Sequence, residues 1–384
     1  MVEPNHYFSA MESIDKIRKF IHKNAELSGK EEKTSEYICS LLSEWGVEFH
    51  KGFSQYSILA FIKGDSAGKS LLFRSELDAL PIQEANDFTH RSIHDGVSHK
   101  CGHDGHMSIL LGLIQRFLKE DWKGGDLYFL FQSAEETGEG AQKIIESDFL
   151  SSFRIDYAIS LHNAPGYEKH TVLCKNDVFT PTVKSFKLKL GGATSHAAEP
   201  DKGINPAFFI ADFIQFMQNL HCTEGEAYFV VAPIFINLGK EAYGVSAGAG
   251  EIGFTIRSVL PSFFEEQKER ILDYARESAK KKGLTLDLEW LEPFKANIND
   301  SYLVDQVKKA TQELGLNYID KPAPFDWGED FGLFSNYFKT VMFGLGSGVD
   351  TPPLHDSKYD FPDEIAETGV NVFFQMAKLI ENDS

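Results

Sequence analysis

Residues 99–112, HKCGHDGHMSILLG, crowd together side chains that can bind metal ions. A thiol, three imidazoles and a carboxylate fall within eight positions, and an apolar run follows them. Imidazole, thiolate and carboxylate ligands together suit Zn²⁺ or a borderline metal such as Mn²⁺, Co²⁺ or Ni²⁺. The oxygen cages that bind Ca²⁺ or Mg²⁺ do not use a cysteine such as Cys101. The stretch therefore indicates part of a transition-metal site just before a helix.

Further metal-capable side chains stand where apolar, strand-like runs end. They are Glu76 and Asp78 in SLLFRSELD, Glu135 and Glu136 in DLYFLFQSAEE, His162 in DYAISLH, and His355 in VMFGLGSGVDTPPLHD. In an open α/β sheet the ligand crevice lies at the carboxyl ends of the strands. Four strands would therefore deliver these groups to one edge, beside the loop Cys101–His106. This convergence predicts one shared metal site.

Each of these signals also has a structural explanation when it stands alone. A Cys-x-His pair is usually a core thiol beside a surface imidazole, and Ala-Glu-Glu often starts a solvated helix whose dipole favours acids. In an extended segment, however, adjacent side chains point apart, so one glutamate could bind metal while the other faces a bound water. Three other histidines are expected to have structural roles: His94, His99 and His106. Six more are expected to lie at the surface: His6, His22, His50, His90, His170 and His221.

Composition limits the classes of function. The net charge of −19 argues against nucleic acid, whose phosphates would be repelled. We expect no signal peptide, because no apolar run follows basic residues at the N-terminus, and no membrane span, because no run of about 18 apolar residues occurs. The four cysteines are widely scattered, which does not suggest a disulfide framework and favours a reducing compartment, the cytoplasm.

The elements that must position the site alternate along most of the chain. Continuous apolar strands interleaved with helices predict an α/β fold with a large mixed, mostly parallel sheet and helices on both faces. Over residues 182–294 the order changes to β-α-β-β-α-β, as in a ferredoxin-like α+β domain. We therefore predict a catalytic domain formed by residues 1–181 and 295–384, with a small domain of residues 182–294 inserted into it.

At this point the sequence resembles a known family: the metallo-aminohydrolases that include hippurate hydrolase, N-acyl-amino-acid deacetylases and auxin-conjugate hydrolases, within the aminoacylase and zinc-carboxypeptidase superfamily. The similarity covers nearly the whole chain in order. Its segments are LDALPIQE, HKCGHDGHMSILLG, QSAEETGEGA, ISLHNAP, GGATSHAAEPDKGINP, WGEDFGLF and PPLHDSKYDFPDE.

The resemblance implies a role for each matching residue. Two divalent metal ions, most often Zn²⁺ or Mn²⁺, would be ligated by Cys101, His103, Glu136, His162 and His355. Glu135 would act as the general base. Asp104 and Asp78 would support the ligands from a second layer, and Glu76 would have no more than such a supporting role.

The resemblance also gives the inserted domain the role of a lid and of a surface for homodimer formation. His196 would reach toward an active site, and Arg257 would bind a substrate carboxylate, unless it only forms a surface salt bridge. One departure concerns Gly244–Ala247, which read GVSA where the family commonly has Asn-Val-Ile-Pro. This change puts the family's usual acyl or amino-acid selectivity in doubt.

The sequence thus favours a metal-dependent hydrolase that cleaves the amide bond of a small-molecule N-acyl amino acid. Two alternatives stay open: a dipeptidase or carboxypeptidase with the same site, and a binding protein that holds metal beneath an altered lid. Glu135 counts against the last, because metal binding requires no base. Neither nucleic acid nor a membrane is expected as a partner.

Overall fold

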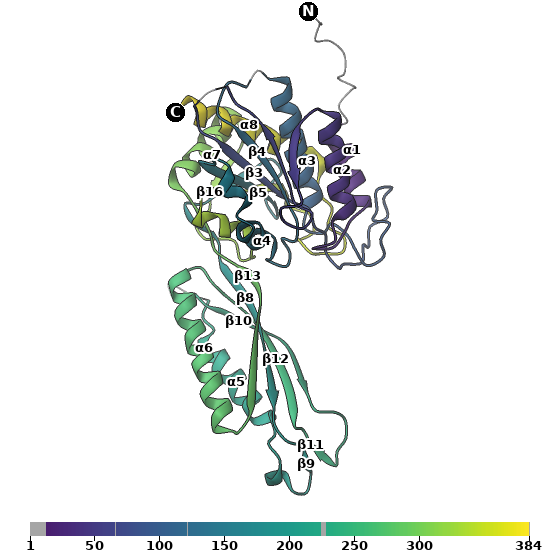
Figure 1. Ribbon diagram of the computed structural model, residues 1–384, viewed down its shortest axis with the longest axis vertical. Coiled ribbons are helices and arrows are strands. Elements are labelled where there is room, and N and C mark those ends of the chain that lie inside the picture. The colour runs from purple at the N-terminus through teal and green to yellow at the C-terminus, as the bar shows by residue number, and fades with distance from the viewer. Residues whose placement is uncertain (1–12, 66, 121, 224–227, 384) are drawn as a thin grey trace, which may run out of the picture. The chain divides into compact units, whose positions relative to one another are not determined.

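The computed structural model describes residues 13–383 except 66, 121 and 224–227 (Figure 1). It confirms the α/β class with a large mixed sheet. The chain forms two compact units. The smaller unit is Thr180–Ala296 together with Pro324–Gly328, and the remaining described residues form the larger unit. The segment Pro324–Gly328 thus joins the small unit, although the sequence division places it in the catalytic domain.

The larger unit contains an eight-stranded sheet in the order β1-β2-β4-β3-β5-β16-β6-β15. Its strands are β1 (Glu48–Lys51), β2 (Ile58–Ile62), β3 (Leu71–Glu76), β4 (Leu127–Gln132), β5 (Tyr157–Pro165), β6 (Val172–Cys174), β15 (Tyr318–Asp320) and β16 (Lys339–Gly348). The four adjacent strands β4, β3, β5 and β16 run parallel. Their carboxyl ends therefore meet at one edge, which is the arrangement that the site requires.

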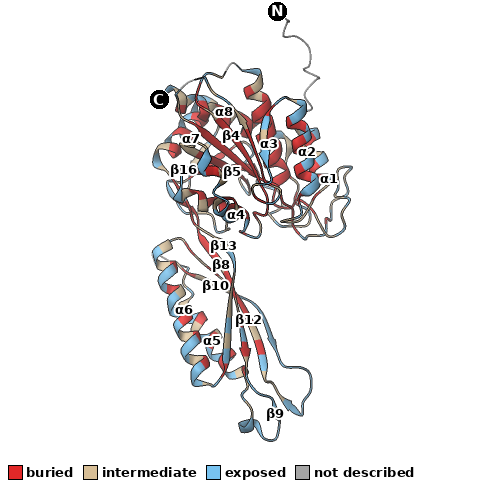
Figure 2. Cartoon of the chain, viewed as in Figure 1, coloured by how far each residue is buried: buried red, intermediate tan, exposed pale blue. Residues whose placement is uncertain are grey.

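Burial explains why these strands read as continuous apolar runs. Every residue of β3 and β4 is buried, so both of their faces are covered. Figure 2 shows this buried region in the middle of the larger unit. One arginine, Arg74, is buried within this apolar context, and its charge must be compensated there.

Helices supply the remaining packing of the larger unit. They are α1 (Ile14–Lys23), α2 (Glu32–Glu44), α3 (His103–Lys119), α4 (Gly140–Glu146), α7 (Ser301–Glu313) and α8 (Ala366–Asn382). Helix α3 packs against α1, α8 and β3, and nearly all of its residues are buried. Short strands β7 (Asp177–Thr180) and β14 (Asn297–Asn299) and the 3₁₀ turns η1 (Phe149–Ser152), η4 (Asp330–Asn336) and η5 (Asp363–Ile365) complete the unit.

The smaller unit has an antiparallel sheet in the order β10-β12-β8-β13, with two helices. In chain order its main elements are β8 (Thr182–Gly191), α5 (Ala207–Leu220), β10 (Val230–Leu238), β12 (Ala249–Ser258), α6 (Pro261–Lys281) and β13 (Thr285–Phe294). This is the β-α-β-β-α-β order that the sequence predicts. A two-stranded ribbon of β9 (Ser195–His196) and β11 (Val245–Ser246) and the turn η2 (Pro200–Lys202) belong to the same unit.

Apolar side chains of α5 and α6 cover one face of this sheet and form a core of their own, with Phe186, Phe213, Phe254 and Ile271 at its centre. Among the described residues of the whole chain, no helix is long and apolar enough to cross a membrane. None of the four cysteines forms a disulfide bond within the described residues, and three of them are buried.

Candidate metal centre

The backbone at Gly102 places two candidate ligands at the start of α3. Gly102 has φ of +98°, and a Cβ atom there would lie 2.2 Å from Asn163 Oδ1, so this position requires glycine. The left-handed turn leaves Cys101 just before the helix and makes His103 its first residue. Both side chains are buried at the carboxyl-end edge of the sheet.

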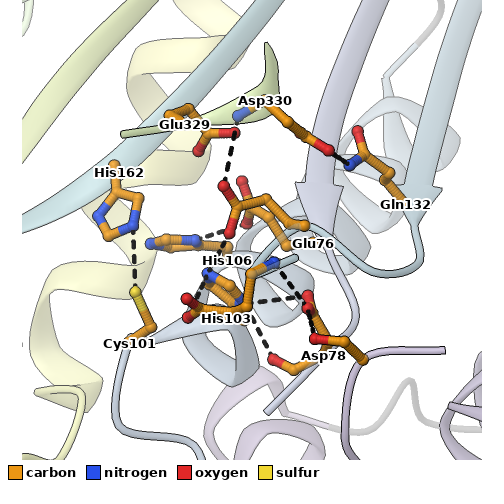
Figure 3. Close-up of polar contacts among 12 residues, drawn as sticks. Glu76, Asp78, Cys101, His103, His106, Gln132, His162, Glu329 and Asp330 are labelled. Atoms are coloured by element: carbon orange, nitrogen blue, oxygen red, sulfur yellow. Dashed lines mark hydrogen bonds and ion pairs between the residues drawn. The ribbon is translucent and has the colours of Figure 1, made fainter. Parts of the chain in front are cut away.

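Five side chains predicted to be ligands come together there from four segments. Cys101 Sγ lies 3.5 Å from His162 Nε2, and His103 Nε2 lies 3.9 Å from Glu136 Oε1. Figure 3 shows Cys101 and His162 facing each other. Glu136 Oε1 is also 3.7 Å from His355 Nε2. The two separations from Glu136 exceed those of hydrogen bonds, whereas 3.5 Å is within the range of a hydrogen bond that involves sulfur. All three would let the atoms share a metal ion.

The candidate ligands form two triads that share one sulfur. Cys101, His103 and His162 offer ligand atoms that all lie within 4.8 Å of one another, and so do Cys101, Glu136 and His355. Moreover, His103 Nε2 and Glu136 Oε1 are buried and have no hydrogen-bond partner. Because unpaired buried polar atoms are costly, these two atoms call for a ligand that can use their lone pairs.

The two adjacent glutamates lie in a turn, and the prediction of an extended segment is wrong. Ala134 adopts the left-handed region with φ of +57°, and Gly138 N–H donates to Glu135 O at 2.7 Å. The turn nevertheless separates the two carboxylates. Glu135 Oε1 accepts from the backbone N–H of Asp330 at 3.4 Å, whereas Glu136 extends toward His355. Glu135 Oε2 lies 3.9 Å from His103 Nε2, so it borders the candidate ligands.

Asp78 touches two of the candidate ligands. The Nδ1–H of His103 donates to Asp78 O at 2.9 Å, and Asp78 Oδ1 lies 3.4 Å from the same nitrogen (Figure 3). Asp78 Oδ2 accepts from the backbone N–H of Glu136 at 2.9 Å. These contacts leave Nε2 of His103 facing the site, as a metal-binding tautomer requires. Glu76 instead bonds His106, which in turn contacts Asn163.

Electrostatics couple metal binding to proton release. Burial disfavours a charged ring at His103, but Asp78 and Glu76 outweigh burial and raise its pKa to about 10. Burial and the neighbouring glutamates raise the pKa of Cys101 well above its ordinary value. Burial, Glu329 and Glu136 do the same for the pKa of Glu135. A cation bound here would displace protons from thiol and imidazole.

A buried cluster of charged residues surrounds Arg74, and it was not predicted from the sequence. Arg74 forms ion pairs with Glu76, with Glu329 at 2.9 Å and with Asp330 at 2.6 Å. Asp330 also accepts hydrogen bonds from Gln132 Nε2 (Figure 3). The Ala141 backbone N–H donates a further hydrogen bond to Asp330. An arginine inside the apolar run SLLFRSE was the signal that could have pointed to such partners.

Asp104 belongs to a second buried cluster. Its Oδ2 accepts from Arg18 at 2.9 Å and pairs with His22 Nδ1 at 2.8 Å, so its carboxylate is directed to these residues. His22 Nε2 contacts Glu84 at 3.0 Å. The prediction that His22 lies at the surface is therefore wrong, because it is fully buried between two carboxylates. These carboxylates outweigh the effect of burial and raise the pKa of His22 to about 9. His6 lies outside the described residues.

The two remaining predicted site residues belong to the smaller unit. His196 is exposed on β9, and its Nδ1 accepts from the Ala198 backbone N–H at 3.0 Å. Val245 pairs with it in the two-stranded ribbon, so the unusual GVSA segment lies beside His196. Arg257 lies in β12, and its Nη1 donates to Asp326 O at 2.5 Å.

Comparisons with known proteins agree with this arrangement. Residues 72–379 match peptidase family M20/M25/M40. The chain is 32% identical over 343 residues to an N-acetyl-L-cysteine deacetylase of Bacillus subtilis, covering 87% of this chain and 80% of that protein. It is 29% identical over 367 residues to an N-acetyldiaminopimelate deacetylase of Bacillus licheniformis, covering 94% of this chain and 97% of that protein.

Among solved structures, a Bacillus subtilis protein described as a dinuclear metal-binding peptidase of the M20 family has the same fold. The TM-score is 0.81 at 24% identity, over 97% of this chain and 98% of the other. The predicted family is confirmed: this chain belongs to peptidase family M20/M25/M40 and is a metal-dependent hydrolase of amide or peptide bonds.

Proposed function

We propose that this enzyme hydrolyses the amide bond of N-acyl amino acids to a carboxylic acid and a free amino acid. The observation that carries the proposal is the pair of metal-capable triads that share Cys101 beside the buried carboxylate of Glu135. The two deacetylase relatives support this substrate class, because their names specify N-acetylated amino acids.

We further propose that the site holds two divalent ions. Cys101, His103 and His162 would hold one ion, and Cys101, Glu136 and His355 would hold the other. The unpaired atoms His103 Nε2 and Glu136 Oε1 fit such a role. The mixed nitrogen, sulfur and oxygen set suits Zn²⁺ or Mn²⁺, and Co²⁺ or Ni²⁺ would also be accepted.

In this proposal the chain's own residues manage the protons. Bound divalent cations would supply Lewis acidity, which acidifies water and polarises an amide carbonyl. Glu135 takes the proton of the attacking water and delivers it to the leaving amine nitrogen. Asp78 keeps His103 oriented during these steps through the two contacts at Nδ1. His196 would help to stabilise the developing oxyanion and Arg257 would bind the substrate carboxylate.

A panel of substrates tests this assignment. N-acetyl and N-benzoyl amino acids are compared with dipeptides after loading with Mn²⁺ or Zn²⁺, and amino-acid release is measured. We expect turnover of the N-acyl compounds to exceed that of the dipeptides. Faster cleavage of dipeptides would instead assign a dipeptidase to the same site, and absence of all turnover in metal-loaded enzyme would contradict the proposal.

Chelation is expected to abolish activity without unfolding the large sheet, because the apolar core of the larger unit includes none of the five candidate ligands. Cys101 should react slowly with thiol reagents in the metal-free protein, because burial raises the pKa of its thiol, and it should be protected in the loaded protein, because coordination occupies its thiolate. Metal analysis and mass spectrometry of the labelled peptide measure both effects. A metal-supplemented protein that binds no transition metal would exclude the site.

We also propose that the enzyme is cytoplasmic, because its cysteines form no disulfide bond within the described residues, as is usual in a reducing compartment.

We propose a homodimer through the smaller unit. Within the described residues, β10 is an edge strand that pairs only with β12, and it exposes Ile234, Ile236 and Leu238. Helix α5 exposes Phe208, whose relative exposure is 69%. An apolar edge of this kind is suited to pairing with a second copy. Light scattering should give the mass of a dimer at micromolar concentration, and Ile236→Lys should shift it toward a monomer. A monomeric wild-type protein would contradict the proposal.

A further inference from the structure

The segment between the first two helices runs beside the metal centre. We call residues 24–31 the connector. Its Leu27 forms a parallel bridge with Ala79, and Ala79 N–H donates to Glu26 O at 2.8 Å. The connector is therefore fixed to the backbone immediately after Asp78, although 50 positions separate Ser28 from Asp78 in the sequence.

Ser28 extends this contact to a side chain of the site. Its hydroxyl donates to Asp78 Oδ2 at 2.6 Å. The same oxygen accepts from the backbone N–H of Glu136, and the other carboxylate oxygen lies near His103 Nδ1. Ser28 thus restrains a carboxylate that contacts both His103 and Glu136.

Glu31 reaches the turn that carries the two catalytic-centre glutamates. Its Oε1 accepts from the Ala134 backbone N–H at 2.8 Å, and its Oε2 accepts from Ser133 Oγ at 2.7 Å. A third bond comes from the Gly29 N–H within the connector. Glu31 is fully buried. Hydrogen bonds from the turn and from the connector therefore replace the water that its carboxylate loses on burial.

These bonds fall on the backbone that aims Glu135 and Glu136. Ala134 is held at φ of +57°, a conformation that non-glycine residues adopt only when their surroundings favour it. Its N–H is bound by Glu31, and the N–H two residues later, at Glu136, is bound by Asp78. Two carboxylates therefore hold the backbone on either side of Glu135. Glu31 belongs to the connector, and Asp78 is hydrogen-bonded to it through Ser28.

We infer that the connector is a positioning element for the metal centre, with Glu31 and Ser28 as its positioning residues. Glu31 keeps the turn in the conformation that separates the base Glu135 from the ligand Glu136. Ser28 keeps Asp78 in place for His103. This inference rests on the proposed metal site, and it adds a third layer of support behind the ligands and Asp78.

The test compares Glu31→Ala with Glu31→Gln. The alanine variant loses all three hydrogen bonds, so we expect Co²⁺ affinity to fall by about 10- to 100-fold and the visible absorption spectrum of bound Co²⁺ to change. The turnover number should fall with little change in KM. Gln can still accept from Ala134 through its amide oxygen and donate to Ser133 through its amide nitrogen, so it should restore the spectrum and most of the affinity.

Thr340→Val is the matched control, because Thr340 is buried in the same unit and donates to Ile298 O at 3.0 Å but makes no bond to the connector or to the site. It should cost stability while leaving the Co²⁺ spectrum unchanged. If Glu31→Ala behaves like Thr340→Val, or if Glu31→Gln fails to restore the spectrum, the connector has no positioning role. If Glu31→Ala does not fold, Ser28→Ala decides, because it removes a single hydroxyl at a partly exposed position; an unaltered Co²⁺ affinity and spectrum would overturn the inference.

Co²⁺ titration needs no substrate, which separates this inference from the substrate assignment. Wild-type protein that binds Co²⁺ but cleaves no N-acyl amino acid would refute the proposed reaction and leave the positioning role to be judged by the spectra. Wild-type protein that binds no Co²⁺ would refute the metal centre and the inference together.

Discussion

The Glu135→Gln variant is expected to lose about 10²- to 10⁴-fold in turnover, the range for removal of a general acid–base group. Gln keeps the size and polarity of the side chain but cannot take a proton from water. Metal content and stability should stay close to those of the wild type, because the proposed assignment makes Glu135 the base and none of the five ligands, although its carboxylate also lies within 4.8 Å of ligand atoms of His103 and Glu136. Steady-state kinetics and metal analysis of the loaded enzyme measure both quantities.

Glu136→Gln provides the matched comparison, because it makes the same chemical change one residue later. It withdraws an anionic ligand from the triad with Cys101 and His355. Metal affinity should therefore fall, and excess metal should restore part of the activity. If Glu135→Gln keeps near-full turnover, or loses metal as readily as Glu136→Gln, the two roles are wrong. If both glutamates only began a solvated helix, either change would cost no more than about 1 kcal/mol in stability and nothing else.

Arg74→Met is expected to cost about 3–5 kcal/mol in the free energy of unfolding, the range for removing one partner of a buried ion pair. Arg74 and its partners Glu76, Glu329 and Asp330 are almost completely buried. Met would fill much of the volume but leave three carboxylates without their cation. Already in the wild type, burial raises the pKa of Asp330 to about 8 although Arg74 opposes this shift.

Urea unfolding of the metal-free protein measures this effect. Arg154→Met is the control, because Arg154 pairs with Asp156 at 3.1 Å and its side chain is 58% exposed. An exposed ion pair contributes about 0–1 kcal/mol, so the control should unfold close to the wild-type midpoint. A loss below about 1 kcal/mol for Arg74→Met would show that the cluster does not depend on its cation.

Local patterns were enough to predict where the candidate ligands stand. Apolar runs of strand length that lead into His, Glu or Asp indicate buried parallel strands, and the geometry of such a sheet brings their carboxyl ends together, beside the loop that carries Cys101. The structure accordingly gathers Cys101, His103, Glu136, His162 and His355. The resemblance added what spacing cannot give, namely the choice of these five residues as ligands and the different roles of the two neighbouring glutamates. The positions of His196 and Arg257 relative to a substrate remain predictions.

The sequence by itself determined the order of the elements, the class of the fold and the chemical types gathered at one sheet edge, because these follow from short-range periodicity. Only the tertiary structure decided which charged groups compensate each other. Arg74 meets Asp330 across 256 positions, Glu31 meets Ala134 across 103, and His22 meets Asp104 across 82. No local pattern encodes such pairs, since they depend on how the elements pack. The same packing holds Ala134 in a left-handed turn that its own residue type disfavours, because a bond from its N–H to the distant Glu31 helps to stabilise that conformation.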